Sequence, residues 1–398
     1  MEFKIKQSVL KEELGFIQGV VERKTTIPVL SNILIESIGE KEIRIVGTDL
    51  DVTIRCDAEA EIIASGAICV QARKLFDIAR NLEPGDVHFK KQENEWVTVK
   101  SGRTNYRLAG VNREQFPEIP SFKSTPLKLS AEIFAYFIRN TAFAITNEQS
   151  RFTLNGAKFI VGDGTAKMVT TDGHRLAYVE RKVDSGDAVM DTLIPKKALL
   201  ELVKITRGQG DVAFGEDPNH IYFETEGRLL ITRKLTGQFP NYEMVMPKDC
   251  DHTAVFDLEE MRAAVRRMSL IADDRNRSIR MTVREGEIEV TAQSAEEGEG
   301  SEIVQTEYKG DEVTLGFNWQ YLLEFLSNVS STEMIAAEAE TAEDGTVKET
   351  EGDKVRVREG SPRTNITFEF KDPNAQTQMY IAGDAAYDYK YIVMPLRI

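Results

Sequence analysis

Three stretches of this chain end alike, and this internal repeat limits the possible folds more than any other feature. They are "QFPEIP" ending at Pro120, "QFPNYEMVMP" ending at Pro247 and "YDYKYIVMP" ending at Pro395. Successive ends lie 127 and 148 residues apart, and the longer third unit contains an acidic segment between Glu333 and Glu359. Because this segment is polar and poor in aromatic residues, it is expected to be a disordered or weakly ordered loop. Without it, the three units match in length, as repeated domains should.

Each unit begins with a short alternating strand, followed by apolar residues at helical spacing. The openings are "FKIKQSVLKEELGFIQGVV", "LKLSAEIFAYFIRNTAFAI" and "AVFDLEEMRAAVRRMSLIA". One helical face is predicted to carry Val9, Leu10, Leu14, Ile17 and Val21 in the first unit, and Leu258, Met261, Val265 and Met268 in the third.

A second helix is predicted in the middle of each unit, in "ARKLFDIARNL", "KKALLELVKIT" and "NWQYLLEFLSNV". Alternating runs such as "IRIVGTDLDVTIRC", "HIYFETEGRLLITRKL" and "TNITFEFKDPNAQTQMYIAG" predict antiparallel strands and hairpins. The expected fold class is α+β, with three similar domains at 1–123, 124–249 and 250–398 and an acidic insertion at about 333–364.

Composition narrows the class of protein further. At 398 residues the chain is long enough for two or three domains, and no segment approaches the roughly 18 apolar residues of a membrane span. The start, "MEFKIKQSVL", alternates charged and apolar residues, unlike a signal peptide, so a cytoplasmic protein without a membrane partner is expected. Cys56, Cys69 and Cys250 show no metal-ligand or disulfide spacing and are expected to be buried; no metal or cofactor is predicted.

The net charge of −15, from 50 basic and 65 acidic residues, argues against nucleic acid as a partner if the charge is uniform. Three predicted helices, however, are locally basic. They carry Arg73, Lys74 and Arg80 in 72–82; Lys196, Lys197, Lys204 and Arg207 in 196–207; and Arg262, Arg266 and Arg267 in 258–272. These helices have either ordinary solvated faces or a shared positive surface that faces a polyanion without reading its bases.

The stretch "TDGHRLA", Thr171 to Ala177, places Asp172, His174 and Arg175 close together. Such a group could form part of a hydrolase site, with His174 as a base oriented by Asp172. In the first unit, "VGTDLDVTIRC" occupies the same place in the repeat, which favours a turn that enters a strand. A structural turn, a binding surface and a catalytic loop all remain open on the residues alone.

Several motifs together resemble those of one family. They are "TIPVLSNILIE" (26–36), "GTDLDV" (47–52), "ARKLFDI" (72–78), "SGRTNYRL" (101–108), "LNG" (154–156), "TTDGHRLA" (170–177), "FPNY" (239–242), "GFN" (316–318) and the terminal "YIVMPLRI". In their order and spacing the chain resembles the bacterial DNA sliding clamps, the beta subunits of DNA polymerase III. The resemblance implies a non-catalytic homodimeric ring, with helices around the hole and antiparallel sheets outside, which encircles double-stranded DNA and confers processivity.

The resemblance also implies a groove in which the replicative polymerase, the clamp loader and repair proteins insert short linear peptides. Its residues here would be Leu154, Thr171, Gly173, His174, Arg175, Leu176, Pro240, Met244, Val245, Asn318, Tyr321, Ile392, Val393, Met394, Pro395, Leu396 and Arg397. Met244 stands where the enterobacterial clamp has arginine, and Ile398 stands where leucine is common.

Two more residue sets follow from the resemblance alone. The DNA-binding set is Lys24, Arg73, Gln149, Arg151, Phe152, Lys196, Lys197 and Arg266, with Phe152 and Thr153 in place of enterobacterial tyrosines. The dimer interface set is Lys74, Arg103 and Leu108 on one side and Leu270, Ile271 and Glu302 on the other. The competing hypotheses are an Asp/His hydrolase, with a metal held by the acidic segment, and a protein scaffold that does not bind DNA.

Overall fold

The computed structural model describes residues 1–22, 26–121, 126–148, 150–184, 186, 189–273, 275–329 and 364–397. Apart from Thr364, the predicted acidic insertion at 333–364 lies outside these ranges. The chain forms two compact units, one of Met1–Ala131 with Lys197–Lys234 and the other of Glu132–Lys196 with Leu235–Ile398. Every strand pair between the described residues is antiparallel, so the predicted α+β class is confirmed. The domain boundaries at 123/124 and 249/250 stay a prediction.

Among the residues that the structure describes, the first unit combines three α-helices with one long sheet. The helices are α1 (Gln7–Ile17), α2 (Ala72–Asn81) and α4 (Lys196–Thr206). The strands are β1 (Glu2–Lys6), β2 (Asn32–Ile38), β3 (Glu42–Thr48), β4 (Val52–Glu59), β5 (Glu61–Ala64), β6 (Ala67–Gln71), β7 (Asp86–Lys91), β8 (Trp96–Ser101), β9 (Thr104–Val111), β10 (Leu127–Ser130), β15 (Asp211–Glu216), β16 (His220–Thr225) and β17 (Arg228–Arg233). They run in the order β10-β15-β16-β17-β4-β3-β2-β6-β9-β8-β7-β1-β5.

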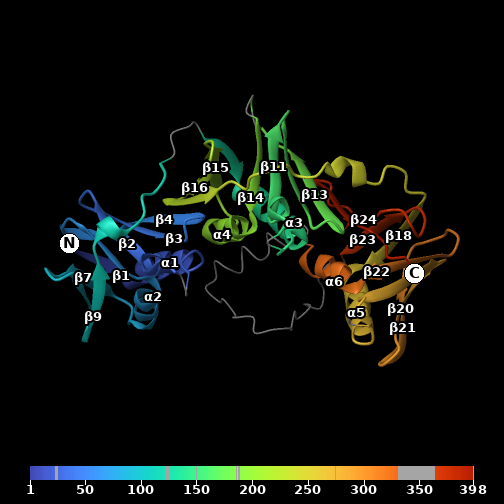
Figure 1. Cartoon of the computed structure of the whole chain (residues 1–398), viewed down its shortest axis with the longest axis horizontal. Coiled ribbons are helices and arrows are strands. Elements are labelled where there is room, and N and C mark those ends of the chain that lie inside the picture. The colour runs from blue at the N-terminus through green and yellow to red at the C-terminus, as the bar shows by residue number, and fades with distance from the viewer. Residues whose placement is uncertain are drawn as a thin grey trace. The chain divides into compact units, whose positions relative to one another are not determined.

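The first helix packs through a partly polar face. Its buried residues are Gln7, Leu10, Glu13, Leu14 and Ile17, whereas Val9 and Val21, predicted on this face, are only half-buried. The apolar pattern missed Gln7 and Glu13 because both are buried with partners: the Gln7 amide donates to the carbonyl oxygen of Ala79 (2.7 Å), and Glu13 accepts from Arg228. The first bond ties α1 to α2, and Figure 1 shows the two helices side by side.

Within its described residues, the second unit has three α-helices and two sheets. The helices are α3 (Ala131–Thr141), α5 (Leu258–Ser269) and α6 (Trp319–Asn328). The strands are β11 (Gly156–Gly162), β12 (Thr165–Thr171), β13 (Arg175–Lys182), β14 (Met190–Pro195), β18 (His252–Asp257), β19 (Ser278–Arg284), β20 (Glu287–Ser294), β21 (Gly298–Gln305), β22 (Val313–Asn318), β23 (Asn365–Phe370), β24 (Thr377–Ile381) and β25 (Asp388–Val393). The sheet orders are β14-β11-β12-β13-β25-β24-β23-β18 and β21-β20-β19-β22.

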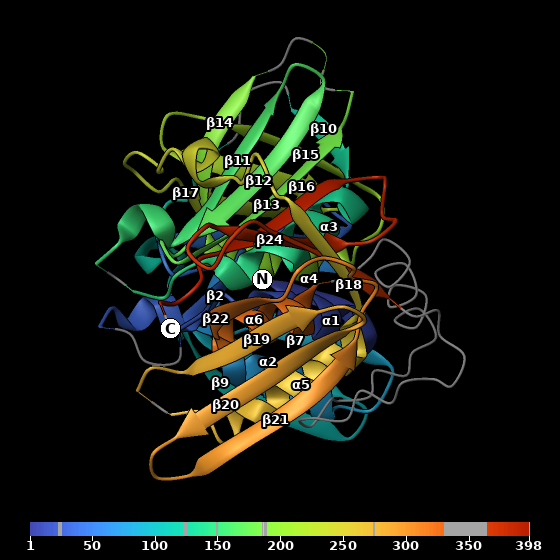
Figure 2. The same ribbon diagram turned by 90° about the vertical axis from the view of Figure 1, so that its right-hand side faces the viewer.

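The larger of these sheets joins distant parts of the sequence. Its central contact is the antiparallel pair β13–β25, in which Arg175 lies opposite Val393 and Glu180 opposite Asp388. In the smaller sheet, β20 and β21 cross α5, as Figure 2 shows. The predicted helical face of α5 is confirmed, since Leu258, Met261, Val265 and Met268 are all buried.

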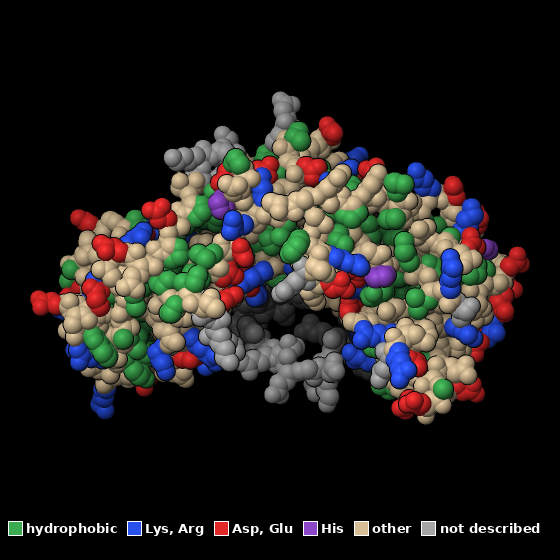
Figure 3. Space-filling model, viewed as in Figure 1, with side chains coloured by type: hydrophobic (Ala, Val, Ile, Leu, Met, Phe, Trp, Pro, Cys, Tyr) green, Lys and Arg blue, Asp and Glu red, His purple; other side chains and the backbone are tan. Residues whose placement is uncertain are grey.

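The basic helices carry part of their positive charge in internal ion pairs. In α4, Lys204 pairs with Glu201 (2.7 Å) and Lys197 pairs with Asp49; in α2, Arg80 pairs with Asp77 (3.6 Å). On the face shown in Figure 3, both basic and acidic side chains appear on each unit. Both helices therefore carry carboxylates close to their cations, which reduces the net positive charge of their surfaces.

The three cysteines are free thiols. Cys56 and Cys69 are buried, as predicted, whereas Cys250 is only half-buried. Burial raises the pKa of the Cys69 thiol to about 11, which keeps it protonated at neutral pH.

Candidate functional site

A groove with a volume of about 200 Å³ lies in the second unit, beside the turn between β12 and β13. That turn forms one wall. A second wall comes from the loop around the short 3-10 helix η5 (Tyr242–Val245), and the end of β25 completes the groove. The lining residues are Thr171, Gly173, His174, Arg175, Leu176, Pro240, Asn241, Tyr242, Val245, Ile392 and Met394.

Asp172 and Thr171 fix the shape of the turn. The carboxylate Oδ1 of Asp172 accepts from the backbone N–H groups of His174 (2.9 Å) and Arg175 (3.1 Å). The Thr171 hydroxyl accepts from the N–H of Gly173 (3.1 Å), and Gly173 has a φ of +91°, which glycine adopts without a steric penalty. The sequence Thr-Asp-Gly therefore folds into a tight turn by side-chain bonds to its own backbone.

Arg175 connects this turn to α6. It is only 7% exposed, and its guanidinium donates to Asp172 Oδ2 (3.0 Å), the carbonyl oxygen of Phe143 (3.0 Å) and Glu324. Burial acts to lower the pKa of Arg175, but Tyr391, Glu324 and Asp172 raise it above its ordinary value, so the side chain stays charged. The Tyr321 ring lies 4.6 Å from the guanidinium carbon. Arg175 is therefore a buried, multiply bonded cation in the wall of the groove.

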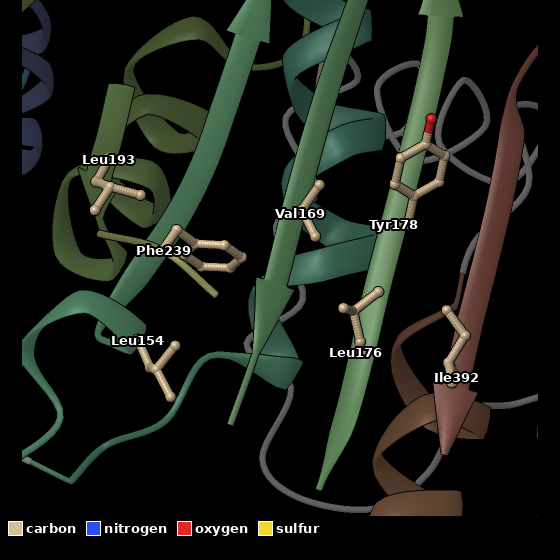
Figure 4. Close-up of a cluster of buried hydrophobic side chains, with 7 residues drawn as sticks. All are labelled: Leu154, Val169, Leu176, Tyr178, Leu193, Phe239 and Ile392. Carbon is tan, nitrogen blue, oxygen red and sulfur yellow. The ribbon is translucent and has the colours of Figure 1, made fainter. Parts of the chain in front are cut away.

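The floor of the groove is a cluster of buried apolar side chains (Figure 4). Leu176 and Ile392 face each other across β13 and β25, with Val169 on the neighbouring strand β12. Val245 and Tyr242 are half-buried and pack against this cluster. An extended peptide could therefore bury apolar side chains against a preformed surface.

The structure brings together nine of the residues implied by the resemblance: Thr171, Gly173, His174, Arg175, Leu176, Pro240, Val245, Ile392 and Met394. Leu154 lies in the cluster beneath. Tyr321 stacks beside His174, with ring centres 6.1 Å apart, and the side chain of Asn318 caps α6.

The other implied residues do not line the groove. Val393 is fully buried and, because side chains alternate along a strand, it points to the opposite face from Ile392. Met244 is 80% exposed beside the groove. Leu396 and Arg397 line another cavity with Arg280, and the N–H of Leu396 donates to the carbonyl oxygen of Gly316 (2.8 Å). Pro395 precedes that contact.

Asn241 and Tyr242 line the groove, although sequence reasoning did not select them. Both belong to "FPNY", a motif that was recognised as part of the repeat, so the signal was present. Which of its residues face outward depends on the η5 turn, and no helical or strand periodicity applies there.

The geometry does not favour the Asp/His hydrolase hypothesis. Asp172 Oδ1 is used by two backbone N–H groups, and Oδ2 by Arg175. The carboxylate thus holds the turn and the arginine, and it does not orient the His174 ring as a base would require. The acidic segment from Glu333 to Glu359, proposed as a metal site, lies outside the described residues.

The predicted DNA-binding residues lie on different elements. Lys24 and Gln149 fall outside the described residues. Arg73 on α2 and Arg266 on α5 are exposed, and Phe152 is 69% exposed. Arg151 donates to the carbonyl oxygen of Asp172 (2.8 Å), which links it to the groove turn. Lys196 contacts Asn147 (3.2 Å), and Lys197 is paired with Asp49.

Most of the predicted interface residues lie on or near β9 in the first unit and the edge strand β21 in the second. Lys74 is exposed on α2, and Arg103 and Leu108 belong to the β8–β9 hairpin. Between Thr104 and Ala109, β9 has no strand partner on the side away from β8 within the described residues. In the second unit, Glu302 lies on β21, an edge strand, and pairs with Arg267. Leu270, which is 75% exposed, and Ile271 follow α5.

The chain is similar to one family along most of its length. Models of the DNA polymerase III beta subunit match it in sequence: the N-terminal domain over residues 1–120, the central domain over 128–241 and the C-terminal domain over 243–357. The Pseudomonas aeruginosa beta sliding clamp is 35% identical over 342 residues, covering 84% of this chain and 92% of that one. The Chlamydia pneumoniae beta sliding clamp is 28% identical over 338 residues, with the same coverage.

Solved structures agree with the sequence comparison. The DNA polymerase III subunit beta of Pseudomonas aeruginosa has a TM-score of 0.86 and 29% identity, with full coverage of both chains. The fold and these matches define a DNA sliding clamp. The chain belongs to the DNA polymerase III beta subunit family. No helix among its described residues is long and apolar enough to cross a membrane.

Proposed function

We propose that this clamp is a non-catalytic, cytoplasmic homodimer of three-domain chains, which encircles duplex DNA and holds partner proteins through short linear peptides in the groove. The partners are the replicative polymerase, the clamp loader and repair proteins. The observation that carries the proposal is the groove itself, an apolar surface walled by Arg175 and the β12–β13 turn. Two related clamps add support: one from Pseudomonas aeruginosa is bound to griselimycin, and one from Caulobacter crescentus holds polyethylene glycol at a proposed beta-motif tethering region.

The groove suits a peptide with two or three apolar side chains. Each side chain buried against Leu176, Val245 and Met394 contributes roughly 1.5 to 3 kcal/mol. After the cost of ordering a flexible peptide, an affinity near micromolar, about −8 kcal/mol, is expected.

Calorimetric titration of a Gln-x-x-Leu-type peptide tests the groove. Met394 is 41% exposed at its edge, so Met394→Asp should weaken binding at least about tenfold by placing a charge against the apolar contact. Val189, 79% exposed and not among the groove residues, provides the matched control: Val189→Asp should bind like the parent. Equal affinity for both variants would refute the groove assignment.

The proposed homodimer is supported by two strands that, among the described residues, lack a partner along part or all of one side, β9 and β21. The open part of β9 and the edge strand β21 both present unpaired backbone groups, which a second copy could pair head to tail. Light scattering should give twice the chain mass of 44.8 kDa. Leu270→Asp, at an exposed apolar position near this edge, should shift the protein toward monomer, and an unchanged mass would remove Leu270 from the interface.

Duplex DNA binding should be topological and only weakly direct. Several predicted contacts, including Lys197, already have acidic partners within the chain, so few phosphates would be neutralised at once and direct affinity should be low and salt-sensitive. After loading, the clamp should stay on nicked circular DNA and leave when the circle is linearised. Equal half-lives on circular and linear DNA would contradict encirclement.

A further inference from the structure

A second cavity in the same unit lies at the other end of β25 from the groove. Its volume is about 370 Å³. Its walls come from α3, β23, β24, β25 and the turn between the last two strands, and they include Tyr136, Glu369, Gln378, Asp384 and Tyr389. Neither the turn nor the motifs that define the groove contribute to it.

Two polar groups of this cavity are buried and have no hydrogen-bond partner among the residues that the structure describes. Gln378 is 9% exposed; its amide nitrogen donates to Glu369, but its Oε1 has no partner within the described part of the chain. Tyr389 is 5% exposed, and its hydroxyl is likewise unpaired there. A buried polar group without a partner costs about 1 to 3 kcal/mol, so a ligand that bonds these atoms would recover this free energy.

The cavity is rich in hydrogen-bond acceptors. Glu369 accepts from two neutral donors, the Tyr380 hydroxyl (2.9 Å) and Gln378, and Asp384 accepts from the Tyr136 hydroxyl (3.1 Å). Asp388 also lines the cavity and lies 3.5 Å from Lys390. Among the described residues, Glu369 has no cationic partner, whereas Asp388 lies beside the Lys390 ammonium group. This balance favours a cationic ligand with several N–H donors, such as a guanidinium or ammonium group.

Two tyrosine rings at this cavity already contact other groups, which leaves less of their faces for a further cation. The Tyr136 and Tyr387 rings stack with centres 3.6 Å apart, and the Arg181 guanidinium lies 4.7 Å from the centre of the Tyr387 ring. Tyr387 therefore already contacts both an aromatic ring and a guanidinium. Recognition of a further cation falls to Glu369 and the amide oxygen of Gln378.

The strand register connects the cavity to the groove. Asp388, Lys390 and Ile392 alternate along β25 and share one face, and Gln378 pairs directly with Ile392. Gln378 lies one strand and Glu369 two strands from Ile392, about 5 and 10 Å at about 4.8 Å per strand, and Asp388 lies four residues along β25, about 13 Å at about 3.3 Å per residue. An extended peptide of about four to six residues can cover this span.

We propose that this cavity binds the guanidinium or ammonium group of a basic side chain, placed about four to six residues from the groove-binding segment of a partner peptide. The proposal rests on the proposed peptide-binding function and adds a charge-based preference to it. The cation would donate to Glu369 and to Gln378 Oε1, and it would supply the partner that this buried amide oxygen lacks among the described residues.

The test compares peptides that differ only in charge. A Gln-x-x-Leu-type peptide carries arginine five residues before or five residues after the groove segment, and each has a twin with citrulline, the neutral isostere of arginine. Calorimetry should show the arginine form binding about tenfold more tightly than its citrulline twin in one of the two directions. Glu369→Gln should reduce this advantage to about twofold or less while citrulline-peptide affinity stays unchanged. Glu297→Gln, an exposed carboxylate not among the cavity residues, is the control and should retain the advantage.

A second arm separates a peptide side chain from a free cation. N-acetylarginine methylamide is titrated into the full chain and followed by NMR. If it binds in a Glu369-dependent way while the two peptide twins bind equally, the cavity is a site for a free cation. Equal twins in both directions and no shift with N-acetylarginine methylamide would overturn the proposal. If no peptide binds at all, the groove assignment fails, and the N-acetylarginine methylamide titration alone then decides whether the cavity takes a cation.

Discussion

The turn between β3 and β4 and the turn between β12 and β13 have the same internal construction in different surroundings. In the first, Asp49 Oδ1 accepts from the N–H groups of Asp51 (3.0 Å) and Val52 (2.7 Å); in the second, Asp172 Oδ1 accepts from the matching positions, His174 and Arg175. Thr48 and Thr171 accept from the residue two positions later, at 3.0 Å and 3.1 Å.

The two turns differ in what the second carboxylate oxygen reaches. Asp49 pairs with Lys197, a side chain that is 40% exposed, whereas Asp172 pairs with Arg175, whose side chain is 6% exposed. Arg175 then contacts Glu324 of α6. The same turn therefore ends at an ion pair with a partly exposed lysine in one unit and becomes the wall of an apolar groove in the other. A shared sequence pattern fixes the turn, and the partner of one oxygen decides its use.

Replacing the paired cation, Arg175 in one turn and Lys197 in the other, should give the largest difference in local stability between the two turns. Arg175→Met leaves Asp172, Glu324 and the Phe143 carbonyl without their donor, so the β12–β13 hairpin should lose about 3 kcal/mol or more of local stability. Lys197→Met should cost the β3–β4 hairpin about 1 kcal/mol or less, because that pair is partly exposed. Hydrogen exchange of each hairpin measures both values. Similar losses of local stability in both hairpins would mean that burial of Arg175 does not strengthen its ion pairs.

Replacing each aspartate with asparagine tests how much its negative charge contributes to the stability of the turn. An asparagine oxygen can still accept the two backbone N–H bonds, so Asp172→Asn and Asp49→Asn remove mainly the ion pair. We expect about 1 to 2 kcal/mol for Asp172→Asn and about half of that for Asp49→Asn. The same exchange measurement applies. A larger loss at Asp49 would reverse the comparison.

The two turns also differ in the residue that adopts a positive φ, and substitutions there should have smaller effects on stability. Leu50 has a φ of +80° and Gly173 a φ of +91°. Leu50→Gly should raise the free energy of unfolding by about 0.5 kcal/mol, because relief of strain outweighs the added freedom of the unfolded chain. Gly173→Ala should lower it by about 1 kcal/mol, since its Cβ would also lie 3.1 Å from Arg151 Nη1. Thermal unfolding of both variants checks the opposite signs.

A third turn of this kind connects β15 and β16, and the pH dependence of its stability should be the smallest of these effects. Asp217 Oδ1 accepts from the N–H groups of Asn219 and His220, both at 2.7 Å. Burial acts to raise the pKa of Asp217, but the Tyr222 hydroxyl and these two N–H groups lower it to about 2, from 3.8. The stabilisation is therefore complete above about pH 4 and is lost as the pH falls toward 2. Exchange of the β15–β16 hairpin should accelerate over this range, and Asp217→Asn should abolish the dependence; an unaltered profile in the variant would exclude Asp217 as its source.

Much of the fold could be predicted because its signals are local and repeated. The helices at 72–82 and 196–207 form as α2 and α4, and the predicted hairpins form as β3–β4, β16–β17 and β23–β24. The face of α1 was misjudged, because Gln7 and Glu13 are buried through partners that lie 72 and 215 residues away. No periodicity within the helix itself reports such partners.

By itself the sequence determined the three-unit repeat, the α+β class and the Thr-Asp turns, since these depend on side-chain periodicity and on bonds within a few residues. The tertiary structure alone decided which of the matching residues share a cavity. β25 lies beside β13 although more than 200 residues separate them, which sets Ile392 against Leu176 and turns Val393 away. It also placed Glu324 beside Arg175 and left the amide oxygen of Gln378 without a hydrogen-bond partner among the described residues, because contacts between distant segments depend on packing and not on spacing along the chain.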